Sequence, residues 1–317
     1  MTATDAPAPG GSALRSRRRR RFSARGGLAG YFFVTPSLLF LAVFVILPIL
    51  ASIYYSFAFY DLMKAPRFIG LDNYLKLLDD ERYSRSITNT LLFAFGTVPS
   101  GVITSLALAV LINRSIRGIY TFRAMFYMPV VSSFVSVSLI WLWMYEPNFG
   151  LFNDIFEWAG LPRLKWLRSA NTAMMSLIIV SVWKNMGLNM VIYLAGLQGI
   201  PPHLYEAAEI DGAGGWKKFM KVTAPLLAPT TFFVVIVYFI GALQMFVQVW
   251  IMTTQVGNNV LTGGPLDSTV TVVVLIYSNA FEYLKMGYAA AMSFVLFVII
   301  ALVTLINVKL LSYESFS

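Results

Sequence analysis

The chain has no cysteine, one histidine and few charged residues, since Asp, Glu, Lys and Arg make up only 12% of its 317 residues. Soluble proteins carry about a quarter. Without cysteine, disulfides, thiolate metal sites and cysteine nucleophiles are excluded. A single histidine, His203, argues against a histidine metal site or proton relay. No constellation of nucleophile, base or metal ligands is visible, so the sequence assigns this chain no catalytic residue, no metal site and no cofactor.

Apolar residues dominate what is present, at 58% of the chain. Several runs exceed the ~20 residues that cross a bilayer. We therefore expect an all-α polytopic membrane protein whose transmembrane domain covers residues 28–311, with six transmembrane helices at residues 28–59, 87–112, 124–145, 171–199, 228–254 and 286–310. A shorter apolar stretch, residues 270–281, predicts a membrane-surface or re-entrant helix. The third run ends with three aromatic residues, Trp141, Trp143 and Tyr145. This pattern predicts an aromatic belt at the membrane–water interface.

Residues 1–27 are rich in Ala, Pro and Gly and then strongly basic, with arginine at every position from 17 to 21. Such a segment cannot bury a core and is expected to be disordered. Its arginines could anchor the N-terminus in the cytoplasm, form a twin-arginine export signal, or bind RNA. We favour the anchor, because the next apolar run is too long for a signal peptide and further spans follow it.

The net charge of +9 is concentrated on one predicted side of the membrane. With a cytoplasmic N-terminus, the inner segments are residues 1–27, 113–123 and 200–227 and the C-terminal segment from Lys309, which includes the tail 312–317. They hold 14 basic and five acidic residues, whereas the rest of the chain holds ten of each. This asymmetry follows the positive-inside rule and places both termini in the cytoplasm. No nucleic-acid partner is needed to explain the charge.

A polar stretch, EAAEIDGAGGWKKFMKVTAP at residues 206–225, separates the fourth and fifth runs. Its helix formers lead into a glycine break and then a second short helix ending near Pro225. His203, beside two prolines, is expected to be an exposed residue at the helix entry. The stretch has no G-x-x-x-x-G-K-[ST] loop, and its GAGG has no preceding strand, so it does not predict a nucleotide site.

The spacing of Glu206-Ala207-Ala208, Gly212 and Pro225 resembles the EAA motif of the membrane subunits of binding-protein-dependent ABC importers. Ala224 departs from the leucine often found there, and Gly214-Gly215 is more flexible than usual. Further segments resemble the carbohydrate-uptake permeases of the maltose and glycerol-phosphate transporter type. These segments are FIGLDNY (68–74), FGLFN (149–153), LAGLQGIPPHLYEAAEIDGA (194–213) and LTGGP (261–265), and the likeness covers residues ~30 to 310, with spans set by bilayer thickness.

The resemblance implies a permease subunit of a bacterial inner-membrane importer that moves a sugar or related polyol inward. It implies a second permease subunit in a heterodimer, an ATPase dimer holding ATP and Mg, and an extracytoplasmic solute-binding protein. The EAA loop would be a cytoplasmic coupling helix seated on the ATPase, with Glu206 pairing a basic residue. The implied coupling residues are Glu206, Ala207, Ala208, Asp211, Gly212, Ala213 and Pro225. Alternatively, Glu206 merely caps the N-terminus of a helix.

Polar residues within the predicted spans form a candidate substrate path. Asn185 and Asn189 are four apart and share a helix face beside Trp183. We expect a second stripe on the fifth span, formed by Gly241, Gln244 and Gln248. Uncharged amides beside aromatic rings suit sugars, but such groups equally hydrogen-bond one helix to another. Lys184 is expected to snorkel to the outer interface.

A self-contained secondary transporter or channel is the alternative from another class. It would require intramembrane carboxylates to bind coupling ions or protons. None of the 15 acidic residues falls in the middle of a predicted span. The sequence therefore favours a subunit that performs no bond chemistry and draws its energy from a partner.

Overall fold

The computed structural model describes residues 24–113, 118–254 and 263–314. Most of the basic N-terminal segment, Arg114 and Arg117, the first two residues of LTGGP and the last three residues therefore lie outside the described part. The chain divides into two compact units, residues 1–51 and 52–317.

The described part of the first unit is a continuous helical run. It comprises α1 (Ala24–Leu41), a π-helical turn η1 (Ala42–Ile46) and the start of α2 (Leu47–Ser56), which continues into the second unit. Pro48 has no N–H to donate, and its ring crowds the carbonyl of Phe44, so the widened turn at this point has a local cause. Residues Phe32–Ser56 are long and apolar enough to cross a membrane.

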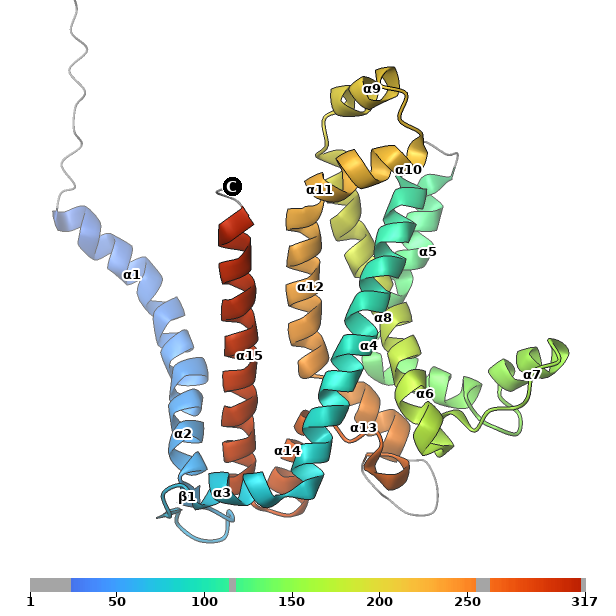
Figure 1. The fold of residues 1–317 in the computed structure, drawn as a ribbon. Helices are drawn as coiled ribbons and strands as arrows, with labels where there is room; N and C mark the ends of the chain where they lie inside the picture. Colours follow the sequence, from blue (N-terminus) through green and yellow to red (C-terminus); the bar gives the residue numbers. More distant parts are fainter. Residues whose placement is uncertain (1–23, 114–117, 255–262, 315–317) are drawn as a thin grey trace, which may run out of the picture. The chain divides into compact units, whose positions relative to one another are not determined.

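The second unit is almost entirely helical (Figure 1). It starts with an antiparallel hairpin, β1 (Ala58–Phe59) and β2 (Arg67–Phe68), in which Ala58 pairs with Phe68. Four long helices carry the bundle: α4 (Glu81–Ile112), α8 (Ala170–Gln198), α12 (Ala228–Leu243) and α15 (Met286–Glu314).

Shorter elements connect the long helices. Before α8 they are α3 (Asp72–Asp79), α5 (Ile119–Val131), α6 (Phe134–Met144), α7 (Leu151–Trp158) and η2 (Trp166–Arg168). Between α8 and α12 they are α9 (Pro202–Ile210), α10 (Gly215–Lys218), η3 (Phe219–Thr223) and α11 (Ala224–Leu226). After α12 they are α13 (Val247–Thr254), η4 (Pro265–Asp267), α14 (Val272–Tyr277) and η5 (Ser278–Glu282).

Helices cover each apolar run, but two of the runs are broken. Residues 124–145 were expected to form one helix, and this is wrong because α5 and α6 meet at 98°. Ser133 caps α6 at the bend by accepting a hydrogen bond from the N–H of Val135. The fifth run stops at Leu243 and resumes at Val247. In the described residues four helices are long and apolar enough to span a membrane. There are up to six if two bent pairs, α5 with α6 and residues 215–226 with α12, each count as one span.

Loops and short elements of the second unit lie at two opposite ends of the helix bundle (Figure 1). One end, here called the α9 end, holds the last turn of α4, the start of α5, the loop of α9 to α11 and the C-terminal end of α15. The other end, here called the hairpin end, holds the β1–β2 hairpin and α3, while α7 projects to the side of the bundle beyond α6. The loop segments predicted to be cytoplasmic in this unit therefore share one end.

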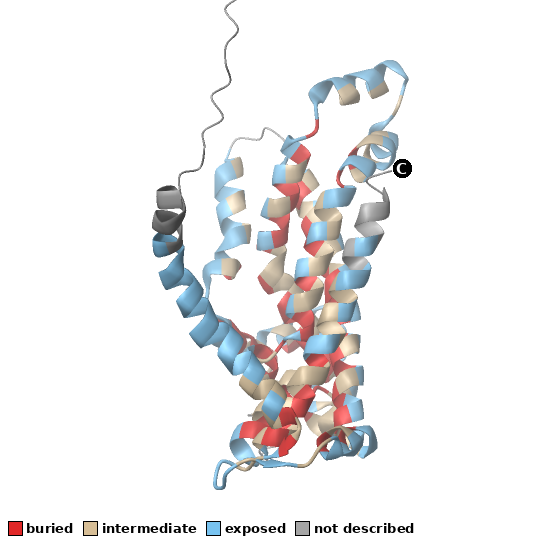
Figure 2. Ribbon diagram, turned by 90° about the vertical axis from the view of Figure 1, so that its left-hand side faces the viewer, coloured by how far each residue is buried: buried red, intermediate tan, exposed pale blue. Residues whose placement is uncertain are grey.

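Buried side chains form two clusters inside the bundle, while the α9 loop is largely exposed (Figure 2). The cluster towards the α9 end includes Met190, Tyr193 and Leu227. The larger cluster includes Trp141 and Tyr145, whose ring centroids lie 5.4 Å apart. The prediction of an interface belt is therefore wrong for Trp141 and Tyr145, because their rings lie in the core. Trp143, the third residue of the predicted belt, is 64% exposed.

The helix of α14 and η5 does not lie on the surface of the unit. Val272, Val274, Leu275, Ser278 and Asn279 along it are buried. A membrane-surface helix would expose one face. The membrane-surface alternative predicted for residues 270–281 is therefore wrong. The segment packs beside α4 and α15 as a short internal helix.

Candidate functional site

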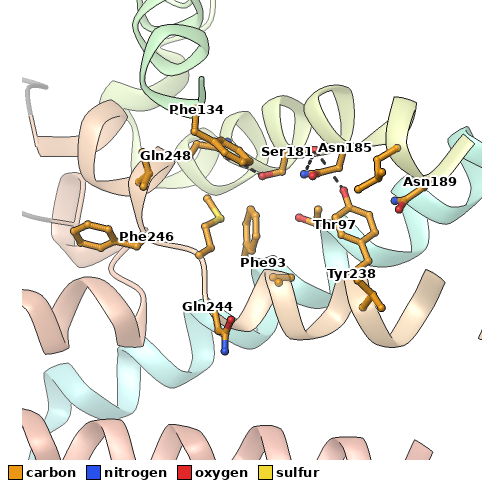
Figure 3. A pocket seen from close by; sticks show the side chains of 16 residues that line it. Phe93, Thr97, Phe134, Ser181, Asn185, Asn189, Tyr238, Gln244, Phe246 and Gln248 are labelled. Carbon is orange, nitrogen blue, oxygen red and sulfur yellow. Dashed lines mark hydrogen bonds between the residues drawn. The ribbon is translucent and has the colours of Figure 1, made fainter. Parts of the chain in front are cut away.

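A cavity of about 310 Å³ lies midway along the bundle, between α4, α8 and the break that separates α12 from α13 (Figure 3). Aromatic and aliphatic side chains form most of its wall, and a small number of uncharged polar groups interrupt them. Its lining residues include Phe93, Thr97, Phe134, Ser181, Asn185, Asn189, Tyr238, Gly241, Gln244, Phe246 and Gln248.

One group of polar side chains in the wall is satisfied by the protein itself. Gln248, 2% exposed, donates from Nε2 to the carbonyl of Leu177 at 2.8 Å and accepts from Ser181 Oγ at 2.7 Å. The carbonyl of Ser181 accepts from Asn185 Nδ2 at 2.9 Å and from the Tyr238 hydroxyl at 3.3 Å (Figure 3). This network holds α13 and α12 against α8. The hydrogen bonds of the Gln248 side chain therefore join helices to one another.

A second group of polar atoms in the wall is unpaired. Asn189 Nδ2 and Thr97 Oγ1 are buried and have no hydrogen-bond partner among the described residues. An unpaired buried donor or acceptor costs about 1–3 kcal/mol, so both atoms favour a hydroxyl-bearing occupant of the cavity. Gln244, at the end of α12, is exposed, and its side chain makes no hydrogen bond within the described part of the chain. These three residues offer free donors and acceptors.

The structure brings five of the six predicted path residues to the cavity. Trp183 is the exception, because it packs on Trp141 at a centroid distance of 5.4 Å instead of lining the wall. The single stripe predicted for Gly241, Gln244 and Gln248 is wrong, since α12 ends at Leu243 and Gln248 belongs to the next helix, α13.

Sequence reasoning missed the aromatic wall and Thr97. The available signal was Thr97 and Gly101, two small residues four apart in an otherwise apolar run, which share one face of α4. Tyr238 carried no such signal, because its contact with Ser181 depends on how α12 packs against α8.

Lys184 does not snorkel, because it is 4% exposed and lies inside the bundle. Its ammonium donates to the carbonyl of Val130 at 3.0 Å and lies 4.7 Å from the centroid of the Phe134 ring. Val130 is in the last turn of α5, where carbonyls lack helical partners and carry the negative end of the helix dipole. Lys184 therefore closes the end of α5 at the α5–α6 bend.

The α9 loop ends its first helix with a Schellman motif. The N–H of Gly212 donates to the carbonyl of Glu209 at 3.0 Å, and that of Ala213 donates to the carbonyl of Ala208 at 2.9 Å. Gly212 has φ +71°, in the left-handed region that favours glycine. The turn predicted at this residue is thus built from backbone hydrogen bonds that need φ > 0.

Side chains join α9 to the segment that follows the turn. Lys218 pairs with Glu209 at 2.6 Å, and Tyr205 Oη lies 3.1 Å from Thr223 Oγ1. Hydrogen bonding from Lys218 holds the pKa of the Glu209 carboxyl below its ordinary value. The ion pair therefore stabilises the folded loop at neutral pH, and this stabilisation is lost as the pH falls through the lowered pKa of Glu209. The pair fixes the two arms of the loop.

Glu206 faces outward from the loop. It lies inside α9, which begins at Pro202 with Pro201 as its N-cap, so the alternative in which Glu206 caps the helix is wrong. Glu206 is exposed and makes no ion pair or hydrogen bond with any described residue. Ile210 and Trp216 on the same loop are 88% and 75% exposed. His203 is exposed at the start of α9, as expected. An exposed carboxylate and exposed large apolar side chains on one loop suit contact with a protein partner.

The described residues contain no group of three or more His, Asp or Glu side chains that could hold a metal ion. A helical membrane bundle with an uncharged central cavity and a structured polar loop at one end is compatible with solute passage. Residues 11–311 match the family of binding-protein-dependent transport system inner membrane components. The chain belongs to this family and is a membrane permease subunit of an ABC transporter.

Relatives support the assignment along nearly the whole chain. The chain is 35% identical to the probable ABC transporter permease protein YesP of Bacillus subtilis, over 96% of each protein. It is 32% identical to AmyD of Thermoanaerobacterium thermosulfurigenes, a probable permease for starch degradation products, over 90% of this chain and 94% of AmyD.

A solved structure shows the same fold. It is a chain of a bacterial alginate ABC transporter in complex with an alginate pentasaccharide-bound periplasmic protein, with TM-score 0.77 and 22% identity over 90% of this chain and 93% of that one. The predicted family and the helical permease fold are confirmed.

Proposed function

We propose that this chain moves a sugar or related polyol through the cavity between α4, α8 and the α12–α13 break. The observation that carries the proposal is the pair of unpaired buried atoms, Asn189 Nδ2 and Thr97 Oγ1, beside the rings of Phe93 and Tyr238. Sugars offer hydroxyls that both donate and accept, and apolar ring faces that pack on aromatic side chains. The reported relative AmyD is named for starch degradation products, which agrees with this class.

The cavity is small for a complete transport site. Its volume of about 310 Å³ is at the lower end of the range for ligand pockets. This fits a single sugar ring or a polyol, and a second permease subunit would complete the passage for a larger solute. The heterodimer expected from the sequence is therefore part of the proposal.

The α9 loop would be the joint to a separate ATPase dimer that binds ATP and Mg. Glu206, Ile210 and Trp216 are exposed on this loop, while Gly212 and the Glu209–Lys218 pair keep its shape. This assignment places the α9 end in the cytoplasm, with both termini, and the hairpin end towards an extracytoplasmic solute-binding protein. Counted together, residues 1–27 and the α9-end loops hold 14 basic residues against ten in the rest of the chain, which supports this orientation. Closure of the ATPase dimer would move α9, and this movement would tilt the transmembrane helices so that the cavity opens to alternate sides of the membrane.

A secondary transporter is disfavoured by the same cavity. No acidic residue occurs in the apolar runs at 87–112, 171–199, 228–254 or 286–310, so the bundle has no carboxylate to bind a coupling ion.

Asn189→Ala and Gln244→Ala are expected to reduce sugar uptake by raising KM about tenfold each, the effect of losing one hydrogen bond to the solute. The measurement is uptake of radiolabelled mono- and disaccharides and polyols into proteoliposomes holding the full transporter. Asn171→Ala, at an exposed amide on α8 that does not line the cavity, is the matched control. Unchanged KM and rate in both variants, with the ATPase still bound, would show that these amides serve packing only.

A further inference from the structure

We propose a second carbohydrate-binding site at the hairpin end of the second unit, separate from the central cavity. A larger cavity, of about 670 Å³, lies there between the β1–β2 turn, α3, η5 and the start of α15. The inference rests on the proposed function for its ligand class, and on its own geometry for the site.

The walls of this outer cavity are fixed by contacts between segments far apart in the chain. The Tyr288 hydroxyl donates to Asp80 Oδ2 at 2.6 Å, across 208 residues of sequence. The N–H of Gly287 donates to the carbonyl of Tyr60 at 3.1 Å. A Cβ at Gly287 would lie 2.1 Å from the carbonyl oxygen of Ala58, so only glycine allows this approach. The cavity is therefore preorganised, which lowers the cost of binding.

Two buried asparagines supply hydrogen-bond acceptors to the outer cavity. Asn73 and Asn279, 4% and 6% exposed, both line it. Asn73 Nδ2 donates to the carbonyls of Ser56 and Ala58 at 2.9 and 3.0 Å, and Asn279 Nδ2 donates to the carbonyl of Leu275 at 2.9 Å. These bonds fix both amides. The carbonyl oxygen of neither side chain accepts a hydrogen bond from a described residue, so both can accept from ligand hydroxyls.

The remaining wall combines charged and aromatic groups. Asp79 and Asp61 offer acceptors, Lys76 and Lys285 offer donors, and the Tyr283 ring is 51% exposed. With Asp80 included, three carboxylates face two ammonium groups, so the charges nearly balance. A phosphate would need an excess of positive charge, and a divalent cation would need converging carboxylates. Mixed donors and acceptors with aromatic faces instead match a neutral polyhydroxylated ring.

The position of the outer cavity gives the site a role. It lies at the opposite end of the unit from α9, which is the side from which the solute arrives in the proposed orientation. It is about twice the volume of the central cavity and has room for more than one sugar ring. The site would receive the saccharide before it enters the bundle.

The test is saccharide binding to the full transporter in nanodiscs without ATP, measured by saturation-transfer NMR. The probes are methyl α-D-glucoside, maltotriose and sn-glycerol 3-phosphate. We expect the two neutral saccharides to bind, and Asp79→Ala and Lys285→Ala each to raise Kd about tenfold by removing a charge-assisted hydrogen bond. Asp72→Ala is the matched control, because Asp72 is an exposed carboxylate of the same helix α3 outside the cavity.

Three results would overturn this site: no saccharide binding, preference for sn-glycerol 3-phosphate, or binding that survives both variants and is lost in Asn189→Ala. The outer site is supported if Asn189→Ala leaves the Kd of this saccharide binding unchanged while Asp79→Ala raises it about tenfold. Saccharide binding of this pattern in a transporter that takes up no sugar would contradict the proposed function alone.

Discussion

Gly212→Val is expected to release the ATPase subunit from this permease while leaving its helices inserted in the membrane. The residue has φ +71°, and both hydrogen bonds of the Schellman motif depend on that conformation. A β-branched side chain in the left-handed region costs about 1–2 kcal/mol, enough to lower the population of the folded turn about tenfold. Because α9 would lose its direction, co-purification of the ATPase with the tagged permease should fall by a similar factor.

Gly214→Val is the matched control for this loss. Gly214 lies two residues further along the same turn, but its φ of −67° and ψ of 169° are open to any residue, and nothing lies within 4 Å of an added Cβ. Gly212→Asn should recover part of the binding, since asparagine tolerates the left-handed region. Equal ATPase recovery from Gly212→Val and the unchanged protein would show that the shape of this turn does not matter for docking.

Lys184→Glu is expected to prevent stable folding of the bundle. The substitution places a carboxylate against the carbonyl of Val130 and the face of the Phe134 ring, where the ammonium now makes a 3.0 Å hydrogen bond. An uncompensated buried charge costs about 3–5 kcal/mol. Thermal unfolding of the permease in detergent should therefore shift sharply downward, with little protein recovered.

Two further lysine variants separate this effect from a general loss of charge. Lys184→Arg should retain most of the thermal stability, because it can still donate to the end of α5. Lys64→Glu, at an exposed lysine of the β1–β2 turn, should change the stability little. A Lys184→Glu protein as stable as the Lys64→Glu protein would contradict the role of Lys184 at the α5–α6 bend.

The apolar runs could be located from the sequence because membrane crossing demands a minimum length of apolar residues. The breaks within them could not. The bend at Ser132 and Ser133 contains no glycine, and the lysine that closes the end of α5 comes from 54 residues away. The break after Leu243 likewise contains neither glycine nor proline. Such breaks depend on tertiary partners, so a periodicity argument continues the helix through them.

The two candidate sites show the same division between local and long-range information. The turn at Gly212 is local, because its hydrogen bonds join residues within five positions, and its shape could be predicted. Asn185 and Asn189 were found because a spacing of four is local too. Thr97 and Tyr238 reach the cavity from other helices. The outer cavity joins residues near 60, 80 and 285, and no sequence pattern connects them.

The central claim is that the α9 loop couples ATP hydrolysis in a partner to solute passage through this chain. The most direct measurement is ATP hydrolysis by the reconstituted transporter with and without its solute-bound binding protein, comparing the unchanged chain with Glu206→Lys and with Asp72→Ala as control. We expect solute-bound binding protein to stimulate hydrolysis in the unchanged and Asp72→Ala transporters, and Glu206→Lys to abolish both the stimulation and the ATPase co-purification. Full stimulation and normal uptake in the Glu206→Lys transporter would contradict the account.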